Sequence, residues 1–289
     1  NPNLINEITL QPLKRFDLDA AIIFSDILMT SYGLGQKVEF KKGSGPILED
    51  INLDKIINTN PEDFVQKLSP IYKGIEKVKN NLKEKELIGF VGAPWTLLLY
   101  MLNKQSPKNN FDFNKINKDQ FLIDTLLKKM EEMICLHADK QIEAGASVIQ
   151  IFDSWAGLLP KRELIKYCYI PILKIVDHIK LKKIPVICFP KGIGENYIDF
   201  CSTVKPDCIS IDYEVDPKLI KEKLNGLPVQ GGLDPKILLT DKEKIKKSTE
   251  NYLNIFKDYP YIFNLGHGVL PEIKPETIEY IIQLVRNKK

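Results

Sequence analysis

The sequence predicts a TIM (β/α)8 barrel, an α/β fold, with its first strand missing from this chain. Short apolar runs of strand length alternate with amphipathic stretches, which is the pattern of a parallel sheet with crossover helices. The runs number seven, one short of the eight that close a barrel. The chain also opens on a helical stretch, residues 6–16, that has no strand ahead of it. The absent strand is therefore expected at the front.

The predicted elements follow one another without interruption. Strands are expected at residues 20–25, 87–91, 147–152, 185–189, 208–211, 228–231 and 261–265. Helices are expected at residues 63–79, 121–145, 160–180, 196–204, 241–256 and 275–286. Because no repeat, low-complexity tract or Gly- and Ser-rich linker divides the series, residues 1–289 are predicted to form a single barrel domain. A doubly wound open sheet would alternate similarly, but no G-x-G-x-x-G turn follows an early strand.

The composition is that of an ordinary globular protein, with 44% hydrophobic and 27% charged residues. No apolar run approaches the ~18 residues that a membrane span needs, and the start lacks the features of a secretory leader. A net charge of +3 and a pI near 8.4 are too mild to indicate a nucleic-acid partner. Five scattered cysteines without C-x-x-C pairing argue against a disulfide framework or a structural zinc. Reduced thiols in a cytoplasm are expected.

In a barrel the chemistry lies at the C-terminal ends of the strands, so the residues after each apolar run are the candidates. Asp26 follows residues 20–25 and is either a functional carboxylate or the N-cap of the next helix. His267 stands between two glycines after residues 261–265, where the backbone bends sharply. Its place at a strand end favours a functional histidine.

Other polar residues near strand ends have simpler interpretations. Lys191 opens a glycine-containing turn that could approach a carboxylate or phosphate, although a solvated turn is the simpler interpretation. Ser154 lacks a surrounding G-x-S-x-G elbow, so substrate hydrogen bonding is favoured over a nucleophilic role. Asp212 and Asp234 are interpreted as structural. Structural roles are also expected for the two histidines within helical patterns, His137 and His178.

Five blocks of sequence, taken in order, resemble the uroporphyrinogen decarboxylase family. The first is LDAAIIFSDIL at residues 18–28, together with LQPL at 10–13. The other four are GFVGAPWT at 89–96, FDSWAG at 152–157, QGGLDP at 230–235 and NLGHG at 264–268. The resemblance covers almost the whole chain. It implies a TIM barrel, usually a homodimer, that converts the four acetate side chains of uroporphyrinogen III to methyls. Coproporphyrinogen III and carbon dioxide are the products, and neither a metal nor an organic cofactor is implied.

The resemblance also implies roles for particular residues. Asp26 and Tyr100 would be catalytic, and both would contact the substrate. Hydrogen bonds to the substrate are implied for Ser154 and His267. Apolar walls of the binding site are implied for three further residues, Ile22, Phe90 and Phe152.

The chain departs from the family pattern at its start. Family members carry an arginine-rich motif on a first strand, and those arginines are thought to bind carboxylates and to include the proton donor. None of Arg15, Arg162 and Arg286 lies in a matching motif, so the general acid is not assigned. Gly232 also replaces the asparagine that usually precedes Leu-Asp-Pro. The sequence predicts either an N-terminal truncation or a protein that is not a competent decarboxylase as it stands.

Two other functions stay open. A tetrapyrrole-binding barrel that lacks its proton donor would bind without turnover. A corrinoid-dependent methyltransferase shares the barrel, but it requires a His-x-Cys pair and another cysteine as zinc ligands near strand ends. Gly268 and Val269 follow His267 instead. Cys188 and Cys208 lie within strand runs and are interpreted as small buried hydrophobic residues.

Overall fold

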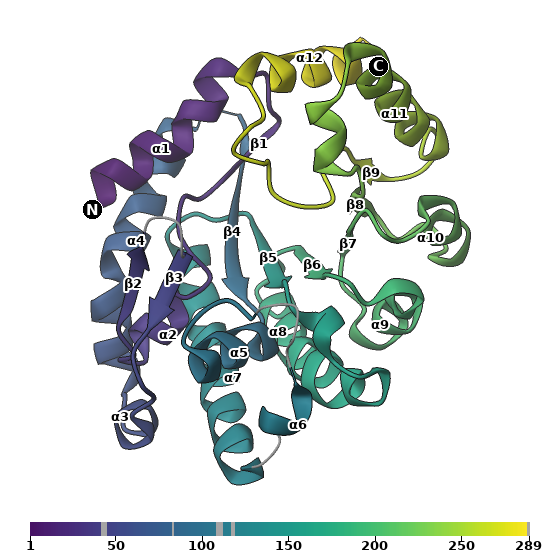
Figure 1. Cartoon of the computed structure of the whole chain (residues 1–289). Coiled ribbons are helices and arrows are strands. Elements are labelled where there is room, and N and C mark those ends of the chain that lie inside the picture. The colour runs from purple at the N-terminus through teal and green to yellow at the C-terminus, as the bar shows by residue number, and fades with distance from the viewer. Residues whose placement is uncertain (42–44, 83, 108–111, 117–118, 288–289) are drawn as a thin grey trace.

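The computed structural model describes residues 1–41, 45–82, 84–107, 112–116 and 119–287. Seven parallel strands form one curled sheet in the order of the chain (Figure 1). They are β1 Ala20–Ile22, β4 Glu86–Gly92, β5 Val148–Asp153, β6 Val186–Pro190, β7 Cys208–Ile211, β8 Val229–Gly231 and β9 Tyr261–Ile262. A separate antiparallel pair joins β2 Val38–Lys41 to β3 Gly45–Leu48. Each of the seven predicted runs overlaps one of the parallel strands, and the predicted fold class is confirmed.

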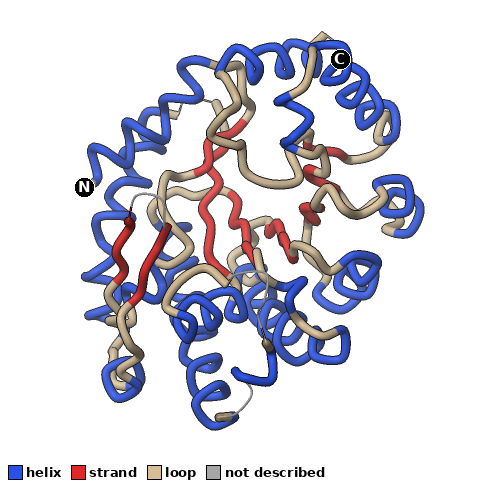
Figure 2. Tube along the Cα trace, viewed as in Figure 1, coloured by secondary structure: helices blue, strands red, loops and turns tan. Residues whose placement is uncertain are grey.

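Helices surround the ring of strands, which lies at the centre of the molecule (Figure 2). They are α1 Pro2–Arg15, α2 Met29–Gly33, α3 Leu53–Ile57, α4 Pro61–Asn81, α5 Pro94–Asn103, α6 Phe113–Ile116, α7 Gln120–Glu143, α8 Ile170–Lys180, α9 Tyr197–Val204, α10 Pro217–Lys223, α11 Lys242–Ile255 and α12 Pro275–Arg286. Short 3₁₀ turns lie at Ala156–Leu158, Lys161–Glu163, Gly194–Asn196 and Pro235–Leu239, and a π turn at Ile165–Tyr169.

Burial alternates along β1 and the residues that follow it. Ala21 and Ile23 are 3% and 2% exposed, whereas Ile22 and Phe24 are 45% and 51% exposed. Successive side chains of a strand point to opposite faces of the sheet. One face of β1 therefore packs against helices, and the other faces the open centre of the ring.

Helix α4 shows how the sequence builds the outer layer. Asn60 caps its first turn by accepting a 2.8 Å hydrogen bond from the Asp63 N–H, and Pro61 occupies the first helical position. Its buried positions are spaced three or four residues apart, as a helix with one apolar face requires. They include Phe64, Leu68, Ile71, Ile75 and Val78.

One predicted helix differs from the structure, and several short elements were not predicted. The helix expected at residues 160–180 is α-helical only from Ile170, because Pro171 has no N–H to continue the hydrogen bonding of the preceding turns. Between β1 and α4 the described residues also form α2, the paired strands β2 and β3, and α3, none of which was predicted. These elements have only four or five residues each, too few to show a period in the sequence.

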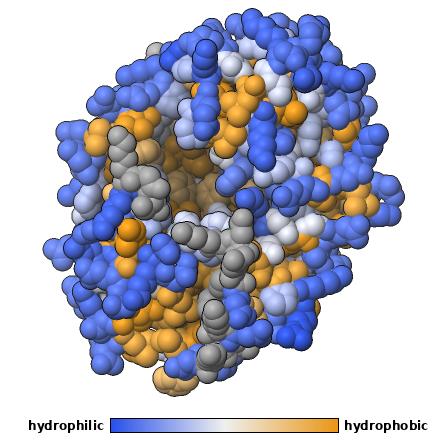
Figure 3. Space-filling model, viewed as in Figure 1, coloured by the Kyte–Doolittle hydropathy of each residue, from blue (hydrophilic) through white to orange (hydrophobic). Residues whose placement is uncertain are grey.

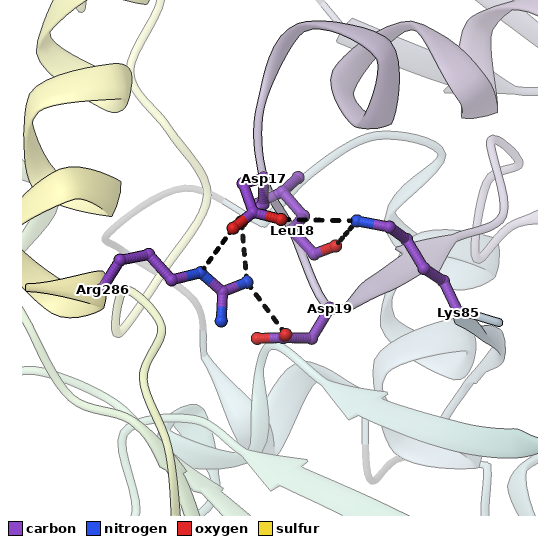
Figure 4. A network of polar contacts seen from close by, with 5 residues as sticks. All are labelled: Asp17, Leu18, Asp19, Lys85 and Arg286. Carbon is purple, nitrogen blue, oxygen red and sulfur yellow. Dashed lines mark hydrogen bonds and ion pairs between the residues drawn. The ribbon is translucent and has the colours of Figure 1, made fainter. Parts of the chain in front are cut away.

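The two ends of the chain meet through ion pairs. Strands β1 and β9 are the edges of the sheet, and they do not pair with each other within the described ranges. Figure 4 shows Arg286, from α12, directed at the loop between α1 and β1. Its Nε lies 3.0 Å from Asp17 Oδ2 and its Nη2 lies 2.9 Å from Asp19 Oδ1. Lys85 joins the same loop by donating a hydrogen bond to the Leu18 carbonyl.

Candidate active site

The carboxyl ends of the parallel strands converge on one opening of the ring. Figure 3 shows a hollow at the centre of this face, with hydrophobic residues inside it. Large apolar side chains of both sheet edges stay exposed, with Ile22 at 45%, Phe24 at 51% and Ile262 at 46%. Apolar groups left open to solvent in this way indicate a ligand site or an unfilled contact.

Three phenylalanines form a continuous aromatic wall in the sheet. The rings of Phe90 on β4 and Phe152 on β5 meet edge to face, with centroids 5.5 Å apart. Phe152 contacts Phe189 on β6 in the same way at 6.1 Å. The structure therefore brings together two of the three predicted wall residues, while Ile22 lies on β1, beside the Ile88 position of β4. Phe189 was not singled out from the sequence, although it occupies the same place in its strand as Phe152.

A polar layer lies deeper between the strands. Gln230 on β8 donates hydrogen bonds to Gln150 Oε1 on β5, at 3.5 Å, and to Ser210 Oγ on β7, at 3.3 Å. All three side chains are 4% exposed. These strands are not all neighbours, so the Gln230–Gln150 contact crosses the inside of the ring. Sequence reasoning missed this layer because isolated polar residues in apolar runs carry no local signal of a shared partner.

Asp26 is not the N-cap of α2, because Leu28 holds that position, and its functional role stays a prediction. Its Oδ1 accepts a 2.8 Å hydrogen bond from the Leu28 N–H, which fixes the turn leading into α2. Burial raises the pKa of Asp26, and the hydrogen bond from Leu28 offsets part of that rise. A partly desolvated carboxylate with one oxygen already bound stands at the end of β1.

The loop after β5 is anchored by a buried carboxylate next to Ser154. Asp153 Oδ1 accepts a 2.6 Å hydrogen bond from the Thr96 hydroxyl, and the same hydroxyl accepts the Trp155 N–H at 3.0 Å. Burial raises the pKa of Asp153 to about 6, and hydrogen bonds from Thr96 and the Cys168 thiol counter only part of that effect. Its Oδ2 is buried and has no hydrogen-bond partner in the described part of the chain. Asp153 thus fixes the backbone on both sides of Ser154.

Tyr100 lies on α5, half-buried, above the same loop. Its hydroxyl accepts a 3.2 Å hydrogen bond from the Ser106 hydroxyl. Its ring lies edge-on to Trp155, with centroids 6.4 Å apart. Tyr100 and Ser154 are therefore brought to one side of the mouth, while Asp26 enters from the β1 side.

His267 lies in the loop after β9, on the opposite side from β5. A Cβ atom on Gly266 would lie only 2.7 Å from the Tyr213 nitrogen, so that loop packs directly on the end of β7. Partial burial lowers the pKa of His267, the nearby charge of Lys191 lowers it further, and Asp212 opposes both effects. Lys191 and His267 therefore lie close enough to interact electrostatically.

The remaining candidates have structural partners. Asp234 Oδ1 accepts the Lys236 N–H at 2.9 Å and caps a 3₁₀ turn, as its sequence predicted. His137 is buried against the Tyr72 hydroxyl at 3.0 Å, and burial lowers its pKa to about 4. His178 lies 3.0 Å from Asp139. The cap predicted at Asp234 is confirmed, and the contacts of His137 and His178 agree with their structural interpretations.

A cavity of about 750 Å³ lies away from the mouth, beneath the β2–β3 hairpin and beside α3. Its lining includes Lys104 and Asp50, which form an ion pair with each other. None of the predicted site residues lines it. The candidate site is therefore placed at the strand ends, where the polar candidate residues lie, and not in this cavity.

Possible metal ligands are dispersed. The described residues contain no group of three His, Cys, Asp or Glu side chains placed to hold a metal ion. Cys168, Cys188, Cys201 and Cys208 are buried as free thiols, and Cys135 is partly buried. Among the residues described, no helix combines the length and the apolar character needed to cross a membrane.

The parallel strands form a curled ring, and carboxylate, imidazole and hydroxyl groups lie at their carboxyl ends. This arrangement defines an enzyme of the (β/α)-barrel class. The family model described as uroporphyrinogen decarboxylase matches residues 1–288 of the chain. The chain belongs to the uroporphyrinogen decarboxylase family.

Curated relatives agree with this membership. A uroporphyrinogen decarboxylase of Rickettsia bellii is 42% identical over 97% of this chain and 84% of its own length. Another from Wolbachia pipientis wMel is 40% identical over 99% of this chain and 85% of its own. The predicted family, and with it the predicted class of enzyme, a decarboxylase of porphyrin biosynthesis, are confirmed by these relatives.

Solved structures of more distant sequence show the same fold. A methyltransferase from Methanosarcina mazei matches 100% of this chain and 86% of its own, with a TM-score of 0.81 and 16% identity. A putative vitamin-B12-independent methionine synthase from Listeria monocytogenes matches with a TM-score of 0.61 and 13% identity. At these identities the likeness concerns the fold alone.

Proposed function

We propose that this chain decarboxylates uroporphyrinogen III, converting its four acetate side chains to methyls and giving coproporphyrinogen III and four molecules of carbon dioxide. The observation that carries the proposal is the partly buried carboxylate of Asp26 at the end of β1, beside an open centre walled by aromatic rings. The identity of the substrate is inferred from membership of the family.

Loss of carbon dioxide from a pyrrole acetate requires an electron sink. Protonation of a pyrrole ring carbon converts the ring to an iminium cation, which accepts the electron pair of the breaking bond between the methylene and carboxylate carbons. A proton then adds to the exocyclic methylene carbon, and the ring loses the proton gained first. Each decarboxylation consumes one proton, replaces one acetate with a methyl and requires no organic cofactor.

Asp26 suits the stabilisation of that cation. An ionised carboxylate offers about four acceptor sites, and one oxygen of Asp26 is committed to the Leu28 N–H. The remaining sites can accept pyrrole N–H groups that converge on the centre of a folded tetrapyrrole. Removal of a preorganised charged group of this kind costs roughly 100-fold or more in rate.

Other residues of the mouth would bind and orient the substrate. We propose that Tyr100 and Ser154 donate hydrogen bonds near Asp26 or the reacting acetate, and that His267 contacts a substrate carboxylate. The walls are Ile22, Phe90 and Phe152. The general acid is not assigned to an arginine of this chain, because Arg15 and Arg286 pair with acids and Arg162 lies against Glu163.

The test is an anaerobic assay with uroporphyrinogen III, in which oxidised products are separated by the number of carboxylates they keep. Asp26→Asn keeps an oxygen for the Leu28 N–H and removes only the charge. We expect a fall in kcat of roughly 100-fold or more. Asp234→Asn, a matched substitution at the Lys236 cap, should keep full activity. Normal turnover by Asp26→Asn would contradict the proposal.

Comparison with a version extended upstream of residue 1 tests the arginine motif expected from the resemblance. Turnover by the extended version alone would place the proton donor in that segment. Tight porphyrinogen binding without turnover by either version would instead favour a tetrapyrrole-binding barrel. The methyltransferase alternative is disfavoured, because the described residues supply no three-ligand zinc site.

We also propose a homodimer in the cytoplasm, formed by a single barrel domain of residues 1–289. The dimer is proposed from the family resemblance. Five free cysteines, four of them buried, support a reducing compartment. One continuous seven-stranded sheet supports a single domain. Light scattering of the purified chain would give its molar mass, and a value near that of a monomer would exclude the dimer.

A further inference from the structure

Lys191 occupies a fixed position at the mouth, directly after β6. Its N–H donates a 3.1 Å hydrogen bond to the Asp153 carbonyl, and its carbonyl accepts the Gly157 N–H at 2.9 Å. Asp153 ends β5, and Gly157 lies in the loop that carries Ser154. The turn that the sequence left as solvated is therefore joined to the β5 loop by two backbone hydrogen bonds.

The next residue is held from the other side. Gly192 donates its N–H to Asp212 Oδ2 at 2.6 Å. The Tyr197 hydroxyl donates to the same oxygen at 2.9 Å, and the Glu214 N–H donates to Asp212 Oδ1 at 2.9 Å. Asp212 is 1% exposed. Its two oxygens are occupied by backbone and hydroxyl donors, so this acid is committed to holding the turn.

Lys191 consequently has no acidic partner. Its ammonium group forms no ion pair or hydrogen bond within the described ranges of the chain. The lysine is only partly exposed, and the His267 imidazole is close enough to interact with its charge. The turn that carries Lys191 and the loop that carries His267 both pack against Asp212, because Gly192 binds its carboxylate and a Cβ on Gly266 would lie 3.0 Å from its backbone carbon. Two basic groups thus lie on adjoining loops at the mouth, an arrangement that an anion would stabilise.

We infer that Lys191 and His267 together bind one carboxylate of the tetrapyrrole, and that this carboxylate is not the one that reacts. The inference rests on the proposed function and adds Lys191 to its substrate contacts. A cation held against the reacting acetate would stabilise the carboxylate and oppose its departure as neutral carbon dioxide. A contact made equally in the ground and transition states lowers KM without raising kcat.

The experiment measures kcat and KM for uroporphyrinogen III in Lys191→Gln and Lys191→Arg. Loss of one charge-assisted contact should raise KM roughly tenfold, with kcat within about twofold. Arginine keeps the charge and should restore most of the affinity. Lys246→Gln is the matched control, because Lys246 is exposed on α11, on the outside of the ring. Its kinetics should equal those of the unmodified chain.

Three results would overturn the inference. They are an unchanged KM in Lys191→Gln, a loss of kcat at constant KM, or a failure of Lys191→Arg to recover affinity. Because the Lys191 side chain has no partner within the described residues, its replacement should leave the thermal unfolding midpoint unchanged. If the chain does not turn over, titration with uroporphyrin by fluorescence quenching tests the site separately. Weaker binding by Lys191→Gln than by the Lys246→Gln control would then support the inference. Equal binding by Lys191→Gln and Lys246→Gln would reject it.

Discussion

The hydroxyl group of Thr96, on α5, donates a 2.6 Å hydrogen bond to the carboxylate of Asp153 at the end of β5. Both side chains are fully buried. The same hydroxyl accepts the N–H of Trp155, so one small side chain connects α5 to both neighbours of Ser154. The geometry of the mouth therefore depends on a residue that is itself closed to solvent.

Thr96→Val should destabilise the fold. Valine has a similar shape but removes the hydroxyl that binds Asp153 Oδ1 and leaves the Trp155 N–H without this acceptor, at a cost of about 1 to 3 kcal/mol. The free energy of unfolding from urea denaturation is the measurement. Thr203→Val, on the exposed side of α9, should change it by less than about 0.5 kcal/mol. Equal effects of the two substitutions would contradict the role given to Thr96.

Asp153 should make stability depend on pH. Burial raises its pKa from 3.8 to about 6, so the folded chain binds more protons than the unfolded chain between these values. The contribution of this carboxyl to stability is therefore full below about pH 4 and is lost as the pH rises to about 6. The loss is on the order of 3 kcal/mol by the size of the shift.

Comparison with Asp153→Asn isolates this effect from other titrating groups. The difference in unfolding free energy between Asp153→Asn and the unmodified chain should move in favour of the asparagine variant between pH 4 and pH 7. Parallel stability curves across this interval would show that Asp153 keeps an ordinary pKa.

Gly157→Ala should disturb the mouth. A Cβ atom at this position would lie 2.6 Å from the Gly192 carbonyl oxygen, which belongs to the backbone of the Lys191 turn. We expect a loss of about 1 to 3 kcal/mol, as for other overpacked sites, and a higher KM as the two loops separate. Gly268→Ala has open space around its Cβ and should unfold at an unchanged midpoint. A fully stable Gly157→Ala would show that the loops separate at little cost.

Arg286→Ala should weaken the contact between the two ends of the chain. Its guanidinium group pairs with Asp17 and Asp19 and donates a 2.8 Å hydrogen bond to the Asp17 carbonyl. Because the two acids are well exposed, the expected loss is only about 1 kcal/mol. Arg162→Ala removes a pair from a side chain that is 79% exposed, and its effect on the unfolding midpoint should be negligible. If Arg286→Ala also left the unfolding midpoint unchanged, this network would not hold α12 in place.

Much of the fold was predictable because it depends on local patterns. Apolar runs of strand length identified all seven parallel strands, and a period of three to four residues identified long helices such as α4 and α7. The antiparallel pair of β2 and β3 was missed because these strands have four residues each, with exposed side chains along most of β2. The π turn before α8 was also missed, because a helical pattern continues across it.

The candidate site was predicted less completely. Asp26, Ser154 and His267 could be proposed because they follow strands, and their roles stay predictions until variants are measured. Phe189, Gln150 and the pairing of Thr96 with Asp153 came only from the structure. These contacts join residues from different strands and helices, and no local pattern in the sequence records such a partner.

The sequence by itself determined the order and type of the main elements, the residues that end each strand and the family, because these follow from periodicity and from motifs within short segments. Only the tertiary structure decided which of those residues are free to act. Asp212 and Lys191 both follow strands, yet the carboxylate of Asp212 is occupied by three donors while the ammonium group of Lys191 pairs with no described acid. That difference arises because β6 and β7 pair in parallel, which brings their carboxyl ends together, and hydrogen-bond capacity is then shared among neighbours that are distant in the sequence.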